Sequence, residues 1–512
     1  MKRAFAALLL TTACGTTVPL AQTTGSPNDG LGQPAANAPG ASEPDSPAAT
    51  SAPGTGGQST SVAATGPGVV GSSGSVSSPV TTGGGGGSHL GRGVTAKTIR
   101  IGVAYQANLD AANRALGGGK VTSGDQLAEA HLLVKDINAH GGLGGRMLVL
   151  DAFAYDAQST QPYAVQDQVA CAHFTQDTKV FAVVGAGLTA TFEECMEKAG
   201  TAVLGADIVR FDVADFRHYP HYFDVQELDL DRLAGSLADE LAADGWAGGW
   251  NATLARSAST KPKVGVVAFD KPRYTSAVRS VLVPRLRAKG LTVPDADLVF
   301  VNEPTSQSDI GPAATQVQNA VLRFAQDGVT HVVLLDTHGG ITQVFLNAAD
   351  GQHYYPRYGM ESGSGTQALL DGGVIRTSQL AGAKGLGWIP ALDLPSSANP
   401  DNGRWSSDDR RRCIGLMKAG GQSFSSTNAE SIALLYCDQL WLLDRSLDTI
   451  PTTPTLSAFT AAVERLGSHA PDASLGASSY TAGKHVGVAR GIEWSFDGSC
   501  GCMTYGRTRD LT

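Results

Sequence analysis

Short apolar runs alternate with amphipathic segments along the chain from about residue 97 onward. Runs such as Lys97–Ala104 and Val264–Phe269 are rich in Val, Ile and Ala, which is typical of strands buried on both faces of a parallel sheet. Segments such as Gly124–Ala139 repeat apolar residues every three or four positions and predict helices. Further strands are expected at Met147–Phe153, Val180–Val184, Thr201–Leu204, Leu298–Val301 and His331–Leu335, and further helices at Gln161–Phe174, Ala190–Ala199, Asp229–Asp244, Ser276–Lys289, Ala314–Gln326, Asn428–Asp444 and Thr455–Leu466.

This alternation predicts an α/β fold. The pattern restarts near residue 224, so we expect two doubly wound lobes with parallel sheets. The segment 491–505 is expected to return to the second lobe as a strand and hairpin. In doubly wound sheets ligands bind outside the carboxyl ends of the strands, so the residues directly after each strand are the candidates for a functional site.

The first residues predict export. Lys2 and Arg3 are basic, Ala4–Leu10 is apolar, and small residues precede Cys14. This order indicates a signal peptide over residues 1–13. The small residues before Cys14 resemble a bacterial lipobox, in which Cys14 would be lipidated; a plain secretion signal is the alternative, because Thr11 stands where Leu is usual.

Residues 14–93 form a predicted tether. Sixty of these 80 residues are Gly, Ser, Thr, Pro or Ala, a composition that cannot bury enough apolar surface to fold. About 80 flexible residues reach roughly 50 Å. With a lipid on Cys14, the tether would hold the folded part at the outer face of the cytoplasmic membrane or in the periplasm. A spacer with no role beyond distance is a compatible alternative.

The cysteines fit an exported protein. The sequence has seven, and the six after Cys14 fall into three neighbouring pairs: Cys171 with Cys195, Cys413 with Cys437, and Cys500 with Cys502. An even number in an exported chain favours disulfides. Zinc is the rival interpretation, but the chain has no C-x-x-C spacing, and we expect no metal site.

Several segments carry a family resemblance. KDINAHGGLGGRMLVL (135–150) looks like the helix-to-turn signature of type I periplasmic binding proteins, and VFAVVGAG (180–187), KVGVVAFDKPRYTSAV (263–278), HVVLLDTHGG (331–340) and YGMESGSG (358–365) follow in the order of that family. The resemblance covers about residues 93–505 and is strongest to the leucine/isoleucine/valine-binding group, the ligand receptors of ABC importers. It implies two lobes joined by three hinge crossings, near residues 224, 388 and 488. Lobe I would comprise 94–223 plus 389–487, and lobe II 224–388 plus 488–512.

The resemblance also implies a ligand site in lobe I. The family binds a ligand carboxylate with hydroxyls and backbone N–H groups at helix starts, which fall here on Thr189 and Thr191 in the loop 185–191. Simple helix capping by these threonines is the alternative. A second loop corresponds to Ala206 and Asp207. Asp207 departs from the family pattern, because its carboxylate would repel a ligand carboxylate or pair with a cation.

Three further site residues are implied in lobe II. Tyr274 matches the family's tyrosine after the first strand, and His338 falls on a second aromatic position. Glu361 matches the acidic residue that receives the ligand's ammonium group. Solvated loop residues are the alternative for each. Both lobes would close on the ligand through charge-assisted hydrogen bonds.

We therefore expect a monomeric, non-enzymatic solute-binding protein. Its partners would be a small polar solute, amino-acid-like or amide-like, and the permease subunits of an ABC importer, with no cofactor. A sensor that binds ligand without transport is one alternative. An NAD-dependent oxidoreductase is another, because Gly185-x-Gly187-x-x-Ala190 followed by Asp207 matches a dinucleotide fingerprint.

Other chemistries have weaker support in the sequence. The net charge of −9 argues against a nucleic-acid partner. A hydrolase would need a G-x-S-x-G elbow, which the sequence lacks. His218 and His221 raise the question of a metal site. They lack a Cys or clustered carboxylate partner set, so packing near the first hinge crossing is the favoured interpretation.

Overall fold

The computed structural model describes residues 91–115, 120–206, 210–243, 245–337, 339–398 and 403–511. The predicted signal peptide, Cys14 and most of the predicted tether therefore lie outside the described residues, as do Asp207 and His338. Among the helices that the structure describes, none has the length and apolar character needed to cross a membrane.

The first sheet has five parallel strands in the order β2-β1-β3-β4-β5. Its strands are β1 (Thr98–Ala107), β2 (Met147–Asp156), β3 (Ala182–Val184), β4 (Ala202–Gly205) and β5 (Tyr222–Asp224). Ile101 of β1 pairs with Leu150 on one side and Ala182 on the other. Ile101 and Ala182 are completely buried, as expected for apolar strands covered on both faces.

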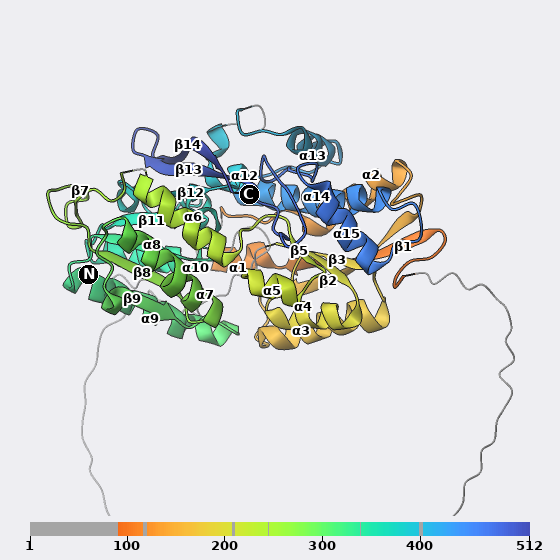
Figure 1. Ribbon diagram of the computed structural model, residues 1–512, viewed down its shortest axis with the longest axis horizontal. Coiled ribbons are helices and arrows are strands. Elements are labelled where there is room, and N and C mark those ends of the chain that lie inside the picture. Colours follow the sequence, from red (N-terminus) through yellow and green to blue (C-terminus); the bar gives the residue numbers. More distant parts are fainter. Residues whose placement is uncertain are drawn as a thin grey trace, which may run out of the picture. The chain divides into compact units, whose positions relative to one another are not determined.

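Helices cover both faces of this sheet (Figure 1). One face packs against α2 (Gln126–Ala139), α14 (Thr427–Asp448) and α15 (Leu456–Leu466), and the other against α3 (Tyr163–Ala172) and α4 (Ala190–Ala199). We call this sheet with these helices and α13 (Asp408–Ala419) the first lobe.

The second sheet has the order β14-β13-β12-β11-β10-β8-β9. Its strands are β8 (Val264–Phe269), β9 (Leu298–Val301), β10 (His331–Leu334), β11 (Arg357–Glu361), β12 (Lys384–Gly387), β13 (Arg490–Asp497) and β14 (Cys502–Asp510). Strands β8 to β12 pair in parallel, whereas β13 and β14 form the expected hairpin and add antiparallel strands at one edge. The sheet is therefore mixed rather than purely parallel.

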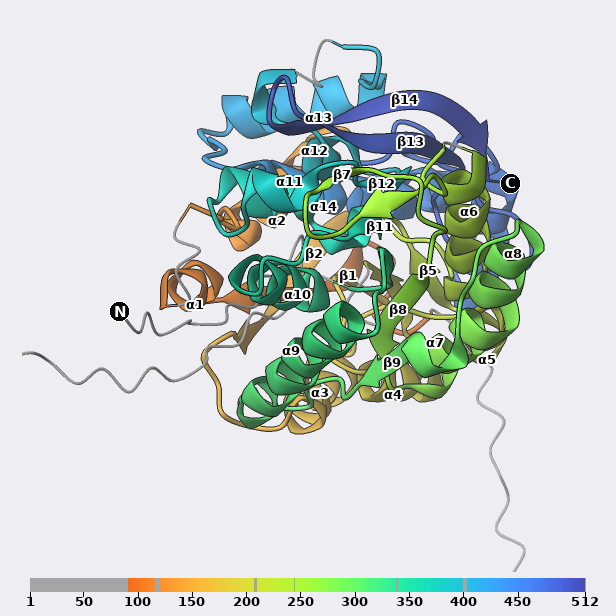
Figure 2. The same cartoon turned by 90° about the vertical axis from the view of Figure 1, so that its left-hand side faces the viewer.

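The helices of this second lobe also lie on both faces of its sheet (Figure 2). They include α6 (Leu230–Ala243), α7 (Pro272–Ser276), α8 (Val283–Ala288), α9 (Ile310–Gln326), α10 (Gly340–Gly351) and α11 (Thr366–Asp371). The shorter elements are α1 (Leu109–Ala115), α5 (Val213–His218), α12 (Pro390–Asp393), β6 (Trp250–Asn251) and β7 (Arg256–Ser257).

The segments that run between the two lobes are hydrogen-bonded to one another. The Asp224 N–H donates to the carbonyl of His485 at 2.8 Å, and the Gly487 N–H donates to the carbonyl of Asp224 at 2.7 Å. The Trp388 indole donates to the carbonyl of Gln226 at 2.8 Å. Segments near 224, 388 and 488, which are far apart in sequence, thus meet at one place between the sheets.

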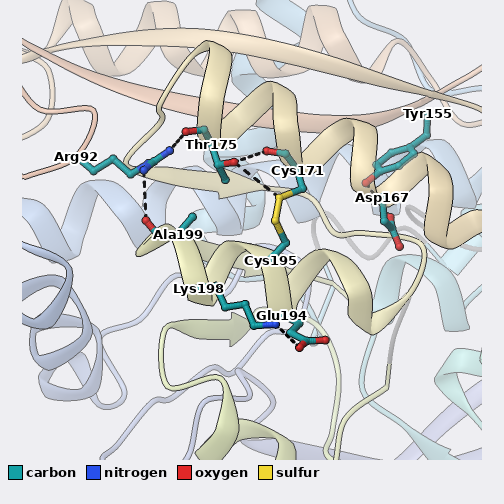
Figure 3. The surroundings of a disulfide bond; sticks show 9 residues. All are labelled: Arg92, Tyr155, Asp167, Cys171, Thr175, Glu194, Cys195, Lys198 and Ala199. Atoms are coloured by element: carbon teal, nitrogen blue, oxygen red, sulfur yellow. Dashed lines mark hydrogen bonds and ion pairs between the residues drawn. A yellow bond between two sulfur atoms is a disulfide. The ribbon is translucent and has the colours of Figure 1, made fainter. Parts of the chain in front are cut away.

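Three disulfides join the cysteines that neighbour each other in sequence. Cys171–Cys195 links α3 to α4, Cys413–Cys437 links α13 to α14, and Cys500–Cys502 closes the turn between β13 and β14. The first of these is drawn in Figure 3. Disulfide bonding, expected from the sequence, is therefore present in both lobes.

The start of the described chain is fastened to the first lobe near this disulfide. The Arg92 guanidinium donates to the carbonyl of Thr175, just after α3, and to the carbonyl of Ala199, the last residue of α4 (Figure 3). The predicted tether therefore joins the folded part beside α3 and α4.

Candidate functional site

A buried ion pair connects the two lobes at the carboxyl end of β11. Glu361, the last residue of β11, is completely buried. Its Oε1 lies 3.3 Å from Nη1 of Arg210, which comes from the segment before α5. The Gly363 N–H donates to Oε2 of Glu361 at 2.6 Å and fixes the carboxylate.

Arg210 also contacts the segment that leaves β5. Its Nη2 lies 2.9 Å from Oε2 of Glu227, and the side chains of both residues are at most 2% exposed. Asp224 positions Glu227, because its Oδ1 accepts the backbone N–H groups of Gln226 and Glu227 at 2.9 and 2.8 Å. One guanidinium thus lies between two buried carboxylates from different parts of the chain.

The charges in this cluster influence one another. Burial raises the pKa of Glu361 to about 7, and the Arg210 guanidinium opposes that rise. Burial also raises the pKa of the Tyr274 hydroxyl, again opposed mainly by Arg210. The charge of Arg210 therefore acts on both Tyr274 and Glu361, the two predicted second-lobe site residues that the structure describes.

Tyr274 lies on α7, next to the carboxyl ends of β8 and β10. Its ring packs edge-on against Phe269, the last residue of β8, and its hydroxyl donates to Oγ1 of Thr337 at 3.4 Å. Asp336 holds this loop, because its carboxylate accepts the N–H groups of Thr337 and Thr342 at 2.7 and 2.8 Å. The structure therefore brings Tyr274 and Glu361 to the same end of the second sheet.

In the first lobe, the carboxylate of Asp167, on α3, is hydrogen-bonded to the predicted ligand loop 185–191. Its carboxylate accepts the backbone N–H groups of Leu188 and Thr189, each at 2.8 Å, and the Thr189 hydroxyl at 2.6 Å. The Tyr155 hydroxyl donates to the same carboxylate at 3.0 Å (Figure 3). The disulfide at Cys171, one helical turn further along α3, holds this helix against α4.

A second carboxylate reinforces this arrangement. Glu193 of α4 is 1% exposed, and its Oε1 accepts the Gly187 N–H at 3.3 Å. Burial is the main reason that the pKa of Asp167 rises to about 6 and that of Glu193 to about 8, and the charge of Asp167 adds to the rise at Glu193.

The other predicted first-lobe residues lie around the same loop. Thr189 is the N-cap of α4 and accepts the Thr191 N–H at 3.2 Å, so helix capping, one of the two interpretations of these threonines, is present. Ala206 follows β4 and is completely buried. Whether any of these residues contacts a ligand stays a prediction.

Further contacts between the lobes surround the cluster. The Arg273 guanidinium, at the start of α7, lies 3.4 Å from Oδ2 of Asp215 and donates to the carbonyl of Arg210 at 3.1 Å. It also lies over the ring of Phe211, 4.9 Å from the centroid. On another segment, the Tyr163 N–H donates to the carbonyl of Thr305 at 2.9 Å. The two lobes therefore contact each other at Arg273, which binds the backbone of Arg210, and at Tyr163.

A pocket of about 430 Å³ lies at the carboxyl end of β1. Two of its lining residues, Gln106 and Gln126, are at least 94% buried, and neither Oε1 of Gln106 nor Nε2 of Gln126 has a hydrogen-bond partner among the described residues. Its other polar lining includes Asn108, Asp110 and Arg114. This is the edge of a doubly wound sheet at which ligands bind.

The histidines considered for a metal make other contacts. His221 Nδ1 lies 2.7 Å from Oγ1 of Thr460, and its Nε2 lies 3.8 Å from Oε1 of Glu197. His218 packs edge-on against Tyr219. In the described part of the chain, no three His, Cys, Asp or Glu side chains are grouped so as to hold a metal ion.

Comparison with solved structures identifies the fold. An ABC transporter substrate-binding protein from Desulfitobacterium hafniense, in complex with Leu, matches 80% of this chain and 100% of its own with a TM-score of 0.53 at 15% sequence identity. The chain has the type I periplasmic binding protein fold. The fold predicted from the resemblance is therefore confirmed.

Two other solved solute-binding proteins match the chain to a similar extent. A solute binding protein of an ABC transporter from Rhodopseudomonas palustris BisB5, in complex with 3,4-dihydroxybenzoic acid, covers 81% of this chain and 98% of its own (TM-score 0.56, 13% identity). A branched-chain amino acid transporter substrate binding protein from Streptococcus pneumoniae, in complex with isoleucine, covers 81% and 99% (TM-score 0.53, 14% identity). No family model and no curated protein matches the sequence.

The charged residues Arg210, Glu227, Asp167 and Glu193 were not predicted as site residues from the sequence. Arg210 lies five residues after the end of β4, whereas the family pattern marks Ala206 and Asp207, which follow the strand directly in the sequence. Asp167 lies within a helix, where an Asp is ordinarily solvated. Its position one turn before Cys171 was the only sign that it faces α4.

Proposed function

We propose that the chain is an extracytoplasmic solute-binding protein without catalytic activity. It captures a small polar solute, amino-acid-like or amide-like, between its two lobes and delivers it to the permease subunits of an ABC importer. The observation that carries this proposal is the meeting of buried polar side chains from both lobes, at the carboxyl ends of strands, in the type I periplasmic binding protein fold.

The ligands of the structural neighbours support the class of solute. Leu, isoleucine and 3,4-dihydroxybenzoic acid are all small organic molecules with polar groups. Binding between two lobes gives a simple mechanism: a solute that contacts both lobes at once is bound more tightly in the closed arrangement, and only such a difference in affinity shifts the balance between open and closed forms.

The place of action follows from the N-terminal sequence. We propose that residues 1–13 direct export, that Cys14 carries a lipid, and that the segment up to residue 93 tethers a monomeric binding protein to the outer face of the cytoplasmic membrane. Incorporation of a labelled fatty acid into the wild-type chain, and its loss in Cys14→Ala, is the expected result. Labelling that persists in Cys14→Ala would contradict the lipid anchor.

A thermal-shift screen tests the binding function. The full chain is heated with amino acids, their amides and aromatic acids. A solute at a hundred times its Kd should add about 2.7 kcal/mol to the free energy of unfolding. Glu361→Ala and Tyr274→Ala should then lower the affinity for the identified solute. Glu194 forms a surface ion pair with Lys198, and Glu194→Ala should leave that affinity unchanged. Unchanged affinity in both site variants would refute the site assignment.

A further inference from the structure

The contacts that an α-amino acid would use at this site are already made by the chain's own side chains. We propose that the site takes an uncharged polar solute, because Arg210 fills the position for a cationic group and Asp167 fills the position for an anionic group. This inference rests on the proposed function and names the class of its ligand.

The cationic position is at Glu361, the residue that the family resemblance assigns to a ligand ammonium. Its carboxylate is paired with Arg210 at 3.3 Å. The backbone makes room for this guanidinium, since a Cβ at Gly363 would lie only 2.0 Å from Nη2 of Arg210. A ligand ammonium would have to displace an arginine side chain that is completely buried, and separating a buried ion pair is strongly unfavourable.

The anionic position is at the loop before α4. The N–H groups of Leu188 and Thr189 and the Thr189 hydroxyl all donate to Asp167. Glu193 accepts the preceding N–H, that of Gly187. Each backbone N–H supplies a single donor, so these groups are not available to a ligand carboxylate. The disulfide between Cys171 and Cys195 keeps Asp167 in place by holding α3 on α4.

An uncharged solute would need to displace neither Arg210 from Glu361 nor Asp167 from the loop before α4. It leaves the Arg210–Glu361 pair and the Asp167 contacts intact. The hydroxyls of Tyr274 and Thr337 lie at the same end of the second sheet. Hydroxyl groups both donate and accept hydrogen bonds, and so match an amide or an alcohol.

A charge series on one skeleton tests the ligand class. Leucine, leucinamide, N-acetylleucine and N-acetylleucinamide are a zwitterion, a cation, an anion and a neutral molecule of similar shape. We expect the neutral member to raise the unfolding midpoint of the full wild-type chain at a concentration at least tenfold lower than any charged member. A charged member that stabilises the wild type as well as the neutral one overturns the proposal.

Replacement of Arg210 tests the occupied position independently of the ligand. Arg210→Ala leaves Glu227 and Glu361 without their cation. Millimolar guanidinium chloride should then raise the unfolding midpoint of this variant relative to the same concentration of sodium chloride, and should not raise that of the wild type. In the variant, leucinamide should become effective at a concentration at least tenfold lower than in the wild type.

The matched control removes the charges together. Arg210→Met with Glu227→Gln and Glu361→Gln replaces the cluster by neutral groups of similar size, a change that folded proteins often tolerate; guanidinium should not stabilise it. If Arg210→Ala does not fold in sodium chloride, the rescue is measured as recovery of folded protein on refolding in the same concentration of guanidinium chloride. Absence of guanidinium rescue overturns the proposal. If guanidinium rescues Arg210→Ala but no solute raises the unfolding midpoint of the wild type, the proposed solute-binding function is refuted. The proposed ligand class is then refuted with it.

Discussion

Gly363 lies against the guanidinium of Arg210, so a side chain at residue 363 would have to displace this group. A Cβ there would be 2.0 Å from Nη2. We expect Gly363→Ala to push Arg210 away from Glu227 and Glu361, and loss of one partner from a buried ion pair costs about 3–5 kcal/mol. Urea unfolding measures this cost as a lower midpoint.

Gly415 provides the control for that substitution. It lies in α13, is exposed, and a Cβ there would meet no atom within 4 Å. Gly415→Ala should leave stability unchanged or raise it by up to about 1 kcal/mol, because alanine favours helix. If Gly363→Ala were as harmless as Gly415→Ala, the close contact at Arg210 would be wrong.

A second residue makes stability depend on pH. Glu129 of α2 is completely buried, and neither of its carboxylate oxygens has a hydrogen-bond partner among the described residues. Burial, with a smaller contribution from the charge of Asp125, raises the pKa of Glu129 from 4.5 to about 8. The folded chain therefore keeps a proton here that the unfolded chain releases.

The sign of the effect follows from that proton. Because the folded state binds more protons between pH 4.5 and about 8, Glu129 lowers stability as the pH rises through this range, by about 1.4 kcal/mol per pH unit. Glu129→Gln should match the wild type at pH 4.5 and be more stable at pH 8, as measured by urea unfolding. Glu194→Gln, at a half-exposed surface carboxyl, should show no such gain. Equal pH slopes for Glu129→Gln and the wild type would contradict the prediction.

At the scale of elements, the apolar pattern predicts strands well and long helices less well. The expected strands Val264–Phe269 and Leu298–Val301 coincide with β8 and β9. The helix expected at Ser276–Lys289 instead begins at Pro272 and contains a π-helical turn, Ala277–Leu282, between α7 and α8. Pro284 explains the irregularity, because proline cannot donate the next helical hydrogen bond and its ring crowds the preceding turn.

The disulfides allow a comparison between elements. Cys171–Cys195 and Cys413–Cys437 each span 24 residues, whereas Cys500–Cys502 spans 2. If disulfides stabilise by restricting the unfolded chain, replacing either long pair by alanine should cost about 3.5 kcal/mol, and replacing the short pair about 1.5 kcal/mol. Urea unfolding of the three double variants provides the test. A large difference between the two long pairs would show that native contacts, rather than loop length, set the cost.

At the scale of the whole molecule, Arg273 should favour the closed arrangement of the lobes. Its ion pair with Asp215, in which each side chain is 22% exposed, and its position over Phe211 both join one lobe to the other. Together such contacts contribute roughly 1–2 kcal/mol, a factor of about five to thirty in the closed-to-open ratio. Arg273→Ala should therefore increase the radius of gyration measured by small-angle X-ray scattering.

Arg285 is the matched control for Arg273. Its ion pair with Asp239 joins α8 to α6 within the second lobe, and its side chain is 49% exposed. Arg285→Ala should leave the radius of gyration unchanged. An equal response of the two variants, or none in Arg273→Ala, would mean that Arg273 does not hold the lobes together.

The two-lobed fold could be predicted from the sequence because it depends on a repeated local pattern and an ordered set of glycine-rich turns. The site could be predicted only in part. Tyr274 and Glu361 follow strands, where ligand contacts are expected, and the structure brings them together. The pairing of Glu361 with Arg210 depends on two segments about 150 residues apart, and no local pattern records such a long-range ion pair.

The attachment at Arg92 has a mechanical consequence. Its bonds to the carbonyls of Thr175 and Ala199 place the exit of the N-terminal segment beside two helices that are cross-linked by Cys171–Cys195. A force applied along the chain from residues before 91 is therefore borne by a covalently braced corner of one lobe. We expect this load to bypass the segments near residues 224, 388 and 488 that connect the two lobes, so tension on the N-terminal segment should leave the arrangement of the lobes unchanged.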